Sequence, residues 1–282
     1  MKPIILLTTT CIFLAFAAFQ SSTLQTGVHM KGEKPQEHYF LSKQYPYLGE
    51  GIQEYKQAVL KELKRMKQTR AYGAAWKMEG PFNTGGRINC LAIHPTQANT
   101  YMVGCADGGI FKTNDGGQTW TPVFDQAYAL SVSSIEFDPT NPQIVYAGTG
   151  DEVLGGYSHI GNGIYKSTDG GNSWTNIGLQ NTGAVAKIII DPSNTSILYA
   201  GTTGNPFLYD PNRGVHKSSD AGATWTKVLY LGTGVGIGDM VINTNNTSII
   251  YATGRHRFRS NNASIITGQR TKIYRSSNGG SS

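Results

Sequence analysis

The chain has 282 residues, of which 35 are glycine and 15% are charged, with a formal net charge of +6. It is long enough to bury one sizeable core, and its composition is typical of a secreted β-sheet protein. No His/Cys cluster has zinc spacing, and the glycine-rich run at 232–238 opens no helix. These observations exclude the common zinc and nucleotide motifs, so we predict no metal and no cofactor.

The first 22 residues are typical of a secretory signal peptide. Lys2 precedes an apolar stretch from Ile4 to Phe19, and small residues follow at Ser21 and Ser22. The stretch is short for a membrane span, so we predict no span once the signal is removed. The protein is therefore expected to be secreted or held at the cell surface, with a glycan or an extracellular protein as its partner and no nucleic acid.

Residues 23–73 are predicted to form a polar leader and one amphipathic helix. In the helix, at 51–70, apolar residues recur at helical spacing, and lysine and arginine lie on the opposite side. We favour a helix packed on the following domain or leading into it, with a solvated basic face, over a membrane-surface or partner helix. Next, Trp76-Lys-Met78 resembles the last strand of the repeat described below. We expect residues 75–79 to complete the last sheet and to remove its free edge.

From residue 74 onward, one phrase repeats with a period near 50 residues. Trp120, Trp174 and Trp225 end three copies of Ser/Thr-x-Asp-Gly/Ala-Gly-x-Ser/Thr-Trp, which we call the turn motif, and a fourth copy begins at Ser276. Such a period predicts one supersecondary unit stacked on copies of itself. The chain ends inside the fourth copy, so we expect it to be an N-terminal fragment whose last repeat lacks its outer strand.

Each repeat contains four short runs of apolar, β-branched and aromatic residues, separated by Asp-Pro, Asn-Thr and Gly-Gly turns. Four strands per repeat around an axis form a propeller blade. The predicted fold class is all-β: a β-propeller of four-stranded antiparallel blades, with about four blades present. Their predicted positions are about 86–124, 132–178, 184–230 and 238–282.

The residues of the turn motif have mechanical roles. Its glycines supply the positive φ that the turn needs, and its aspartates accept hydrogen bonds from their own turn. Its tryptophans are large enough to wedge between blades. We therefore predict structural roles for six residues: Asp115, Trp120, Asp169, Trp174, Asp220 and Trp225.

Over roughly residues 74–282 this pattern resembles the Asp-box, or bacterial neuraminidase repeat, of sialidases, sortilin-type receptors and xyloglucan-cleaving glycoside hydrolases. The leader, the entry from Trp76 to Arg87 and the loop from Gly148 to Asp151 resemble secreted bacterial proteins with sortilin-like propellers, many of which use the type IX export system. The resemblance implies a propeller whose motif aspartates lie away from the central axis. A sialidase is not indicated, since Gly86-Arg-Ile-Asn89 lacks the proline of that family's entry motif and no arginine triad can be assigned.

The most specific catalytic candidate is Asp107, in the loop between the second and third strands of the first repeat. Resemblance to the xyloglucanases implies that a catalytic carboxylate lies in this loop, although the loop here is one residue shorter. Glycoside cleavage also needs a second carboxylate, which in that family comes from a second propeller. The alternative, which we favour, is a turn residue before Gly108-Gly109.

Two further groups are candidate ligand sites. The same loop of the second repeat is longer and carries acidic, aromatic and histidine side chains that could hold a sugar or a calcium ion: Asp151, Glu152, Tyr157 and His159. The insertion at 254–271 carries Arg255 and Arg257 beside an aromatic residue, a pattern suited to an acidic glycan or protein surface. A solvated loop is the alternative for both.

Two questions stay open from the sequence. Cys90 and Cys105 lie on consecutive strands, where a cross-strand disulfide and two buried thiols are both conceivable. For function, the first hypothesis is a non-catalytic sortilin-like propeller that binds glycan or protein. The alternatives are the N-terminal propeller of a xyloglucanase-like glycoside hydrolase, with Asp107 as its base, and a structural module of an adhesin.

Overall fold

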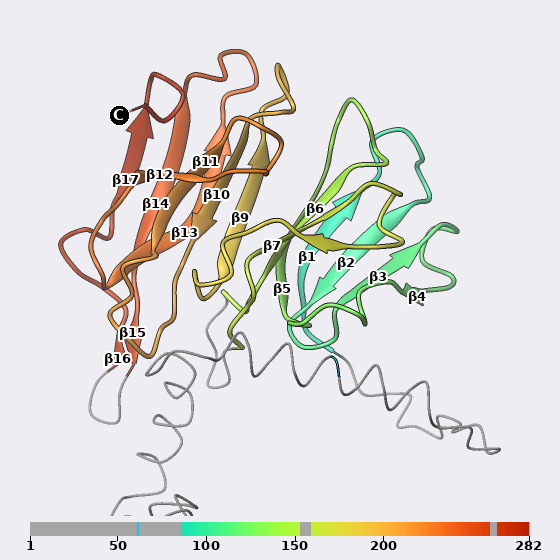
Figure 1. The fold of residues 1–282 in the computed structure, drawn as a ribbon, viewed down its shortest axis with the longest axis horizontal. Helices are drawn as coiled ribbons and strands as arrows, with labels where there is room; N and C mark the ends of the chain where they lie inside the picture. The colour runs from blue at the N-terminus through green and yellow to red at the C-terminus, as the bar shows by residue number, and fades with distance from the viewer. Residues whose placement is uncertain (1–60, 62–85, 153–158, 260–263, 282) are drawn as a thin grey trace, which may run out of the picture. The chain divides into compact units, whose positions relative to one another are not determined.

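A computed structural model of the chain describes residues 61, 86–152, 159–259 and 264–281 (Figure 1). Apart from Lys61, which is helical, the described secondary structure consists of β-strands. The predicted signal peptide, the leader, nearly all of the predicted helix at 51–70 and the predicted closing strand at 75–79 lie outside the described residues. In the described part of the chain, no helix is long and apolar enough to cross a membrane.

Three four-stranded antiparallel sheets follow the three complete repeats, each with its strands in chain order. The first contains β1 (Ile88–Ile93), β2 (Tyr101–Cys105), β3 (Ile110–Thr113) and β4 (Thr121–Pro122). The second contains β5 (Val132–Phe137), β6 (Val145–Thr149), β7 (Ile164–Ser167) and β8 (Thr175–Asn176). The third contains β9 (Val185–Ile190), β10 (Leu198–Thr202), β11 (Gly214–Ser218) and β12 (Thr226–Leu229).

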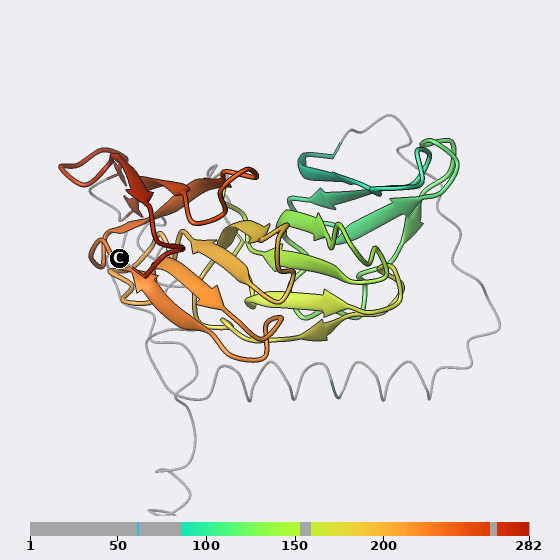
Figure 2. The same ribbon diagram turned by 90° about the horizontal axis from the view of Figure 1, so that it is seen from above.

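The fourth sheet has three strands among the described residues: β13 (Val235–Ile242), β14 (Ile250–His256) and β17 (Ile273–Ser276). A small hairpin, β15 (Phe258–Arg259) and β16 (Ser264–Ile265), occupies the connection from β14 to β17. Consecutive sheets contact one another through their first strands, β1 with β5, β5 with β9 and β9 with β13, and Figure 2 shows them succeeding one another. The predicted fold class, an incomplete propeller of antiparallel blades, is confirmed.

Each turn motif is closed by its own aspartate. Asp169 accepts a hydrogen bond from the Ser167 hydroxyl at 2.7 Å, and from the backbone amide and hydroxyl of Ser173 at 2.9 and 2.6 Å. The same bonds recur around Asp115 and Asp220. As predicted, glycines after the aspartate have positive φ, +67° at Gly170 and +86° at Gly171.

A lysine immediately before each of the three complete motifs reaches the motif of the next blade. Lys112 Nζ donates to the carbonyl of Gly170 at 2.8 Å, and Lys217 Nζ to that of Gly279 at 2.7 Å. Lys166 makes the same bond to Ala221, at 3.1 Å. The turn motif therefore serves two functions: it closes its own hairpin and presents a backbone acceptor to the preceding blade.

The motif tryptophans pack between blades where a preceding blade is described. The indole of Trp225 donates to the carbonyl of Ile177 in the second blade at 3.1 Å. Trp174 packs edge-on against Phe124, with ring centroids 5.3 Å apart. Trp120, in the first described blade, is 41% exposed.

The apolar core lies between successive sheets, and a glycine in the second strand of each of the first three sheets allows the next sheet to approach. A Cβ on Gly148 would lie 2.8 Å from Cγ1 of Val185 in the next blade, and one on Gly201 would lie 2.7 Å from Cγ2 of Ile237. Both neighbours are fully buried. The recurring Ala-Gly at the end of these strands is therefore a packing requirement, because interiors are close-packed.

Cys90 and Cys105 are both free thiols. The register explains why they are not directly paired: a bulge in β1 puts Cys90 opposite Gly104, and Cys105 opposite Ile88. Burial raises the pKa of Cys90 to about 12, so this thiol stays protonated and unreactive at neutral pH.

The turn-motif aspartates should make the fold sensitive to acid. Hydrogen bonds lower the pKa of Asp115 and Asp220 from 3.8 to about 2, with the threonine four residues later as the largest cause. For Asp169 burial acts in the opposite direction, but hydrogen bonds from Ser173 and Ser167 outweigh it and hold the pKa at about 2. An acid with a depressed folded-state pKa stabilises the fold above its unfolded pKa, and this contribution is lost as pH falls towards 2.

We therefore expect the melting temperature of the wild type to fall between about pH 4 and pH 2. A variant with Asp115, Asp169 and Asp220 all changed to Asn should have a lower melting temperature than the wild type at pH 7. Its melting temperature should also fall less than that of the wild type when the pH is lowered. Circular dichroism melts across this range test the prediction, with Asp125→Asn, at an exposed position, as the control. Parallel pH profiles for wild type and the triple variant would contradict it.

Candidate functional site

The two ends of the sheets carry different kinds of loop. Each turn motif is bonded to the first turn of its own blade, as in the bonds from Gly116 N to Asn99 O and from Gly170 N to Gln143 O, both 2.9 Å. Because the strands are antiparallel, the loops between second and third strands must lie at the opposite end. The ligand-site candidates among the described residues occur near these loops, and the loops fall at the lower end of the sheets in Figure 1.

Asp107 and His159 come together from two different blades. The side chain of Asp107 is 68% exposed on the β2–β3 loop, whose Gly109 amide is held by the carbonyl of Leu130 at 2.6 Å. His159 Nε2 lies 3.4 Å from Asp107 Oδ2 and is itself partly exposed. The sequence presented these residues as parts of separate candidate sites, and the structure places them at one solvent-facing position.

Asp151 is a buried anchor. Its carboxylate is wholly enclosed and pairs with Arg87 at 2.5 Å, and the Asn89 amide donates to it at 3.4 Å. Its backbone amide donates to the carbonyl of His159 at 2.8 Å. Asp151 therefore ties the long loop of the second blade to the first blade and fixes the backbone of His159, so its carboxylate is not open to a ligand.

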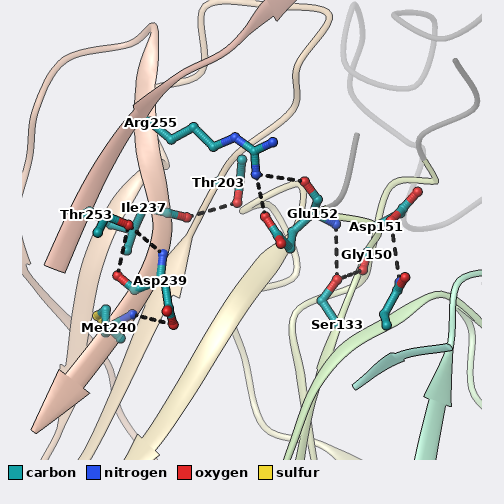
Figure 3. A network of polar contacts seen from close by, with 11 residues as sticks. Ser133, Gly150, Asp151, Glu152, Thr203, Ile237, Asp239, Met240, Thr253 and Arg255 are labelled. Atoms are coloured by element: carbon teal, nitrogen blue, oxygen red, sulfur yellow. Dashed lines mark hydrogen bonds and ion pairs between the residues drawn. The ribbon is translucent and has the colours of Figure 1, made fainter. Parts of the chain in front are cut away.

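Glu152 and Arg255, predicted in two separate candidate groups, form an ion pair (Figure 3). Arg255 Nη1 lies 2.8 Å from Glu152 Oε2 and also donates to the Glu152 carbonyl at 3.3 Å. The Glu152 amide donates to the Ser133 hydroxyl, which in turn donates to the carbonyl of Gly150. Burial raises the pKa of Glu152, and the Arg255 guanidinium opposes that shift. The pair thus joins the second blade to the fourth.

The basic run at 255–259 is less accessible than its sequence suggests. Arg255 is engaged by Glu152, and Arg257 is only 9% exposed, with its backbone amide bonded to Gly234 O at 3.1 Å. Burial, followed by the nearby charges of Arg259 and Arg255, lowers the pKa of Arg257. Arg257 is thus nearly buried, whereas the Arg255 side chain is 39% exposed but already paired with Glu152. Tyr157, the remaining candidate of the second loop, lies outside the described residues.

Two features near the same loops were missed by the sequence analysis. Arg213 is fully buried in the β10–β11 loop, and Tyr209 of that loop stacks on Phe258 of the small hairpin. The sequence does carry a signal for this feature, the run Pro206-Phe-Leu-Tyr-Asp-Pro211. Large aromatic residues in a connection between two strands are not needed to make the turn, so they indicate a further role. No group of three or more His, Cys, Asp or Glu suited to a metal occurs within the described part of the chain.

No protein-family model matches the chain. Curated relatives are nevertheless similar over part of it. The chain is 27% identical over 181 residues to a xyloglucanase of Hypocrea jecorina, which covers 58% of this chain and 20% of the relative. It is 28% identical over 158 residues to a xyloglucanase of Acetivibrio thermocellus, which covers 51% of this chain and 18% of the relative. An oligoxyloglucan-reducing end-specific xyloglucanase of Emericella nidulans is 35% identical over 109 residues, which covers 36% of this chain and 12% of the relative.

Solved structures support the fold. The GH74 xyloglucanase from Xanthomonas campestris aligns with a TM-score of 0.51 at 19% identity, over 70% of this chain and 30% of that one. An ancestral GH74 enzyme aligns with a TM-score of 0.50 at 23% identity, over 63% and 23%. The chain spans a fifth or less of the length of the curated relatives named above. The similarity favours the xyloglucanase-like alternative, and the first hypothesis, a sortilin-like module, is unsupported.

The Asp151 anchor gives a direct test of this site. Asp151→Ala should destabilise the fold by about 1–3 kcal/mol, because Arg87 and Asn89 lose a charged acceptor at a buried position. Chemical denaturation of wild type and variant measures this difference. Asp125→Ala, which removes an exposed carboxylate of the first blade, should change the free energy of unfolding by less than about 0.5 kcal/mol. Equal stabilities for Asp151→Ala and wild type would show that the anchor contributes nothing.

Proposed function

We propose that this chain forms the substrate-binding propeller of a glycoside hydrolase that cleaves xyloglucan or a similar polysaccharide. The observation that carries the proposal is its sequence similarity to xyloglucanases over about half of its length. The exposed carboxylate of Asp107, on the loop where the resemblance implies a catalytic group, supports it.

Under this proposal, Asp107 acts as the base. Hydrolysis of a glycosidic bond needs one carboxyl group to protonate the leaving oxygen and a second carboxylate to activate water or attack the sugar. Asp107 is exposed enough to meet a sugar or a water molecule. His159, with Nε2 at 3.4 Å, is placed to orient that carboxylate, and the bond from Asp151 N to His159 O holds the histidine backbone.

The second carboxylate is expected from outside the described residues. The two acidic groups of the neighbouring loop are already engaged, Asp151 by Arg87 and Glu152 by Arg255. Releasing Asp151 would leave a fully buried carboxylate without its arginine, which is costly. Releasing Glu152 would break the ion pair that joins this loop to the fourth blade. Under this proposal, a second propeller supplies the acid, as the resemblance to xyloglucanases implies, and the sugar chain lies between the two.

A secreted polysaccharide hydrolase is consistent with the predicted signal peptide and with a glycan as partner. The assignment of the turn motif to the Asp-box repeats, and export by the type IX system, remain predictions of the sequence.

The proposal predicts that Asp107→Asn lowers xyloglucan hydrolysis by the intact protein at least about a hundredfold, because the amide cannot act as a base. Binding should persist, since the substitution keeps the shape of the side chain. Reducing-sugar release and affinity electrophoresis in xyloglucan gels measure the two properties.

Asp125→Asn is the matched control, an exposed aspartate of the same blade, and should hydrolyse xyloglucan like the wild type. Full activity in Asp107→Asn would refute the catalytic role of Asp107. An intact wild type that neither binds nor cleaves xyloglucan would overturn the proposed function as a whole.

A further inference from the structure

Two aromatic rings from different blades are stacked beside the loops described above. The rings of Tyr209, on the β10–β11 loop, and Phe258, on β15, have centroids 4.4 Å apart and planes only 9° from parallel. Tyr209 is 56% exposed, although its loop neighbours Phe207 and Asp210 are buried. One face of the tyrosine ring is therefore supported by Phe258, and much of the residue is open to solvent.

The loop that carries Tyr209 is held from beneath by a fully buried arginine. Arg213 Nη2 donates to the carbonyls of Asn205 and Leu208, at 2.6 and 3.1 Å, on either side of the buried Phe207. The Asp210 carboxylate accepts from the Asn205 amide at 3.0 Å. Charged groups bonded in this way fix the backbone, so Tyr209 is displayed on a rigid support.

The same loop is fastened to the fourth blade. The backbone amide of Arg259 donates to the carbonyl of Pro206 at 2.7 Å, and that of Asp210 donates to the carbonyl of Thr233 at 2.9 Å. Arg213 Nη1 also reaches the carbonyl of Gly234, at 3.2 Å. These contacts set the position of Phe258 relative to Tyr209, so the stacked pair is a feature built by two blades.

A rigid, exposed and supported aromatic ring suits a sugar. Sugar rings present C–H groups with partial positive charge, which fit the negative face of an aromatic ring. Tyrosine also offers contact area at a low cost in side-chain entropy. The loop of Tyr209 lies at the same end of the sheets as the loop of Asp107, and a polysaccharide is long enough to contact more than one blade.

We propose that Tyr209, supported by Phe258, is a stacking site for a sugar unit of the polysaccharide, separate from the position of Asp107. The choice of a glycan rests on the proposed function. Tyr209 binds and positions the chain but takes no part in bond cleavage.

Binding of xyloglucan oligosaccharides, measured by calorimetry in the Asp107→Asn background, tests this site without consuming the ligand. Tyr209→Ala should weaken binding about tenfold, as expected for the loss of about 1.4 kcal/mol. Tyr209→Phe, which keeps the ring and loses the hydroxyl, should bind within about twofold of its parent. In the otherwise wild-type protein, Tyr209→Ala should raise KM and leave kcat unchanged, since the lost contact is made equally in ground and transition states.

Tyr251→Ala is the control, since Tyr251 is 40% exposed on β14 and outside these loops. It should bind like its parent. A folded Tyr209→Ala that binds within about twofold of its parent would overturn the inference and leave the proposed function intact. Conversely, if the intact protein binds xyloglucan without cleaving it, the hydrolase proposal fails, and the Tyr209 comparison still decides the stacking site. Absence of any binding would refute both.

Discussion

The contact on which the rest of this structure depends is the bond from a lysine of one blade to a backbone carbonyl in the turn motif of the next. It recurs three times, from Lys112, Lys166 and Lys217. The acceptor carbonyl is available because the motif aspartate and glycines close the turn without using it. Two of these lysines also lie over a tyrosine ring, 5.4 Å from its centroid, so the charge is held by a π face as well as a carbonyl. A blade without its neighbour would leave this lysine, and the ring beneath it, unsupported.

The groups that stabilise the blades and the groups of the candidate site lie at opposite ends of the strands. The turn motifs occupy one end of the sheets, and their aspartates are committed to hydrogen bonds within their own hairpins. The loops at the other end are free of this constraint and differ in length, from the short turn at Gly108 to the long connection that contains β15 and β16. Rigid scaffolds commonly carry binding residues on such loops. The recurrence of the motif therefore accounts for the fold, whereas differences between the loops account for the site.

The blades were predictable because their signals are local. A strand, a turn and a tryptophan recur within about 50 residues, and the hydrogen bonds of Asp115 and Asp169 span at most four residues. The site was predictable only in part, because its contacts are not local. Arg87 and Asp151 are 64 residues apart, and Glu152 and Arg255 are 103 apart. No spacing rule shows which acidic side chain meets which arginine, so the sequence could not separate buried anchors from accessible groups.

These ion pairs also explain why Asp107 differs from the other acidic candidates. Asp151 and Glu152 each join the long loop of the second blade to another blade, the first through Arg87 and the fourth through Arg255. A loop tied at two points can hold His159 steadily against a residue of a different blade. Asp107 has no arginine partner among the contacts of the described residues, and its side chain remains the most exposed of the three. The three acidic groups therefore have different roles, since Asp151 and Glu152 are paired with arginines and position the loop, whereas Asp107 is left free to meet a substrate.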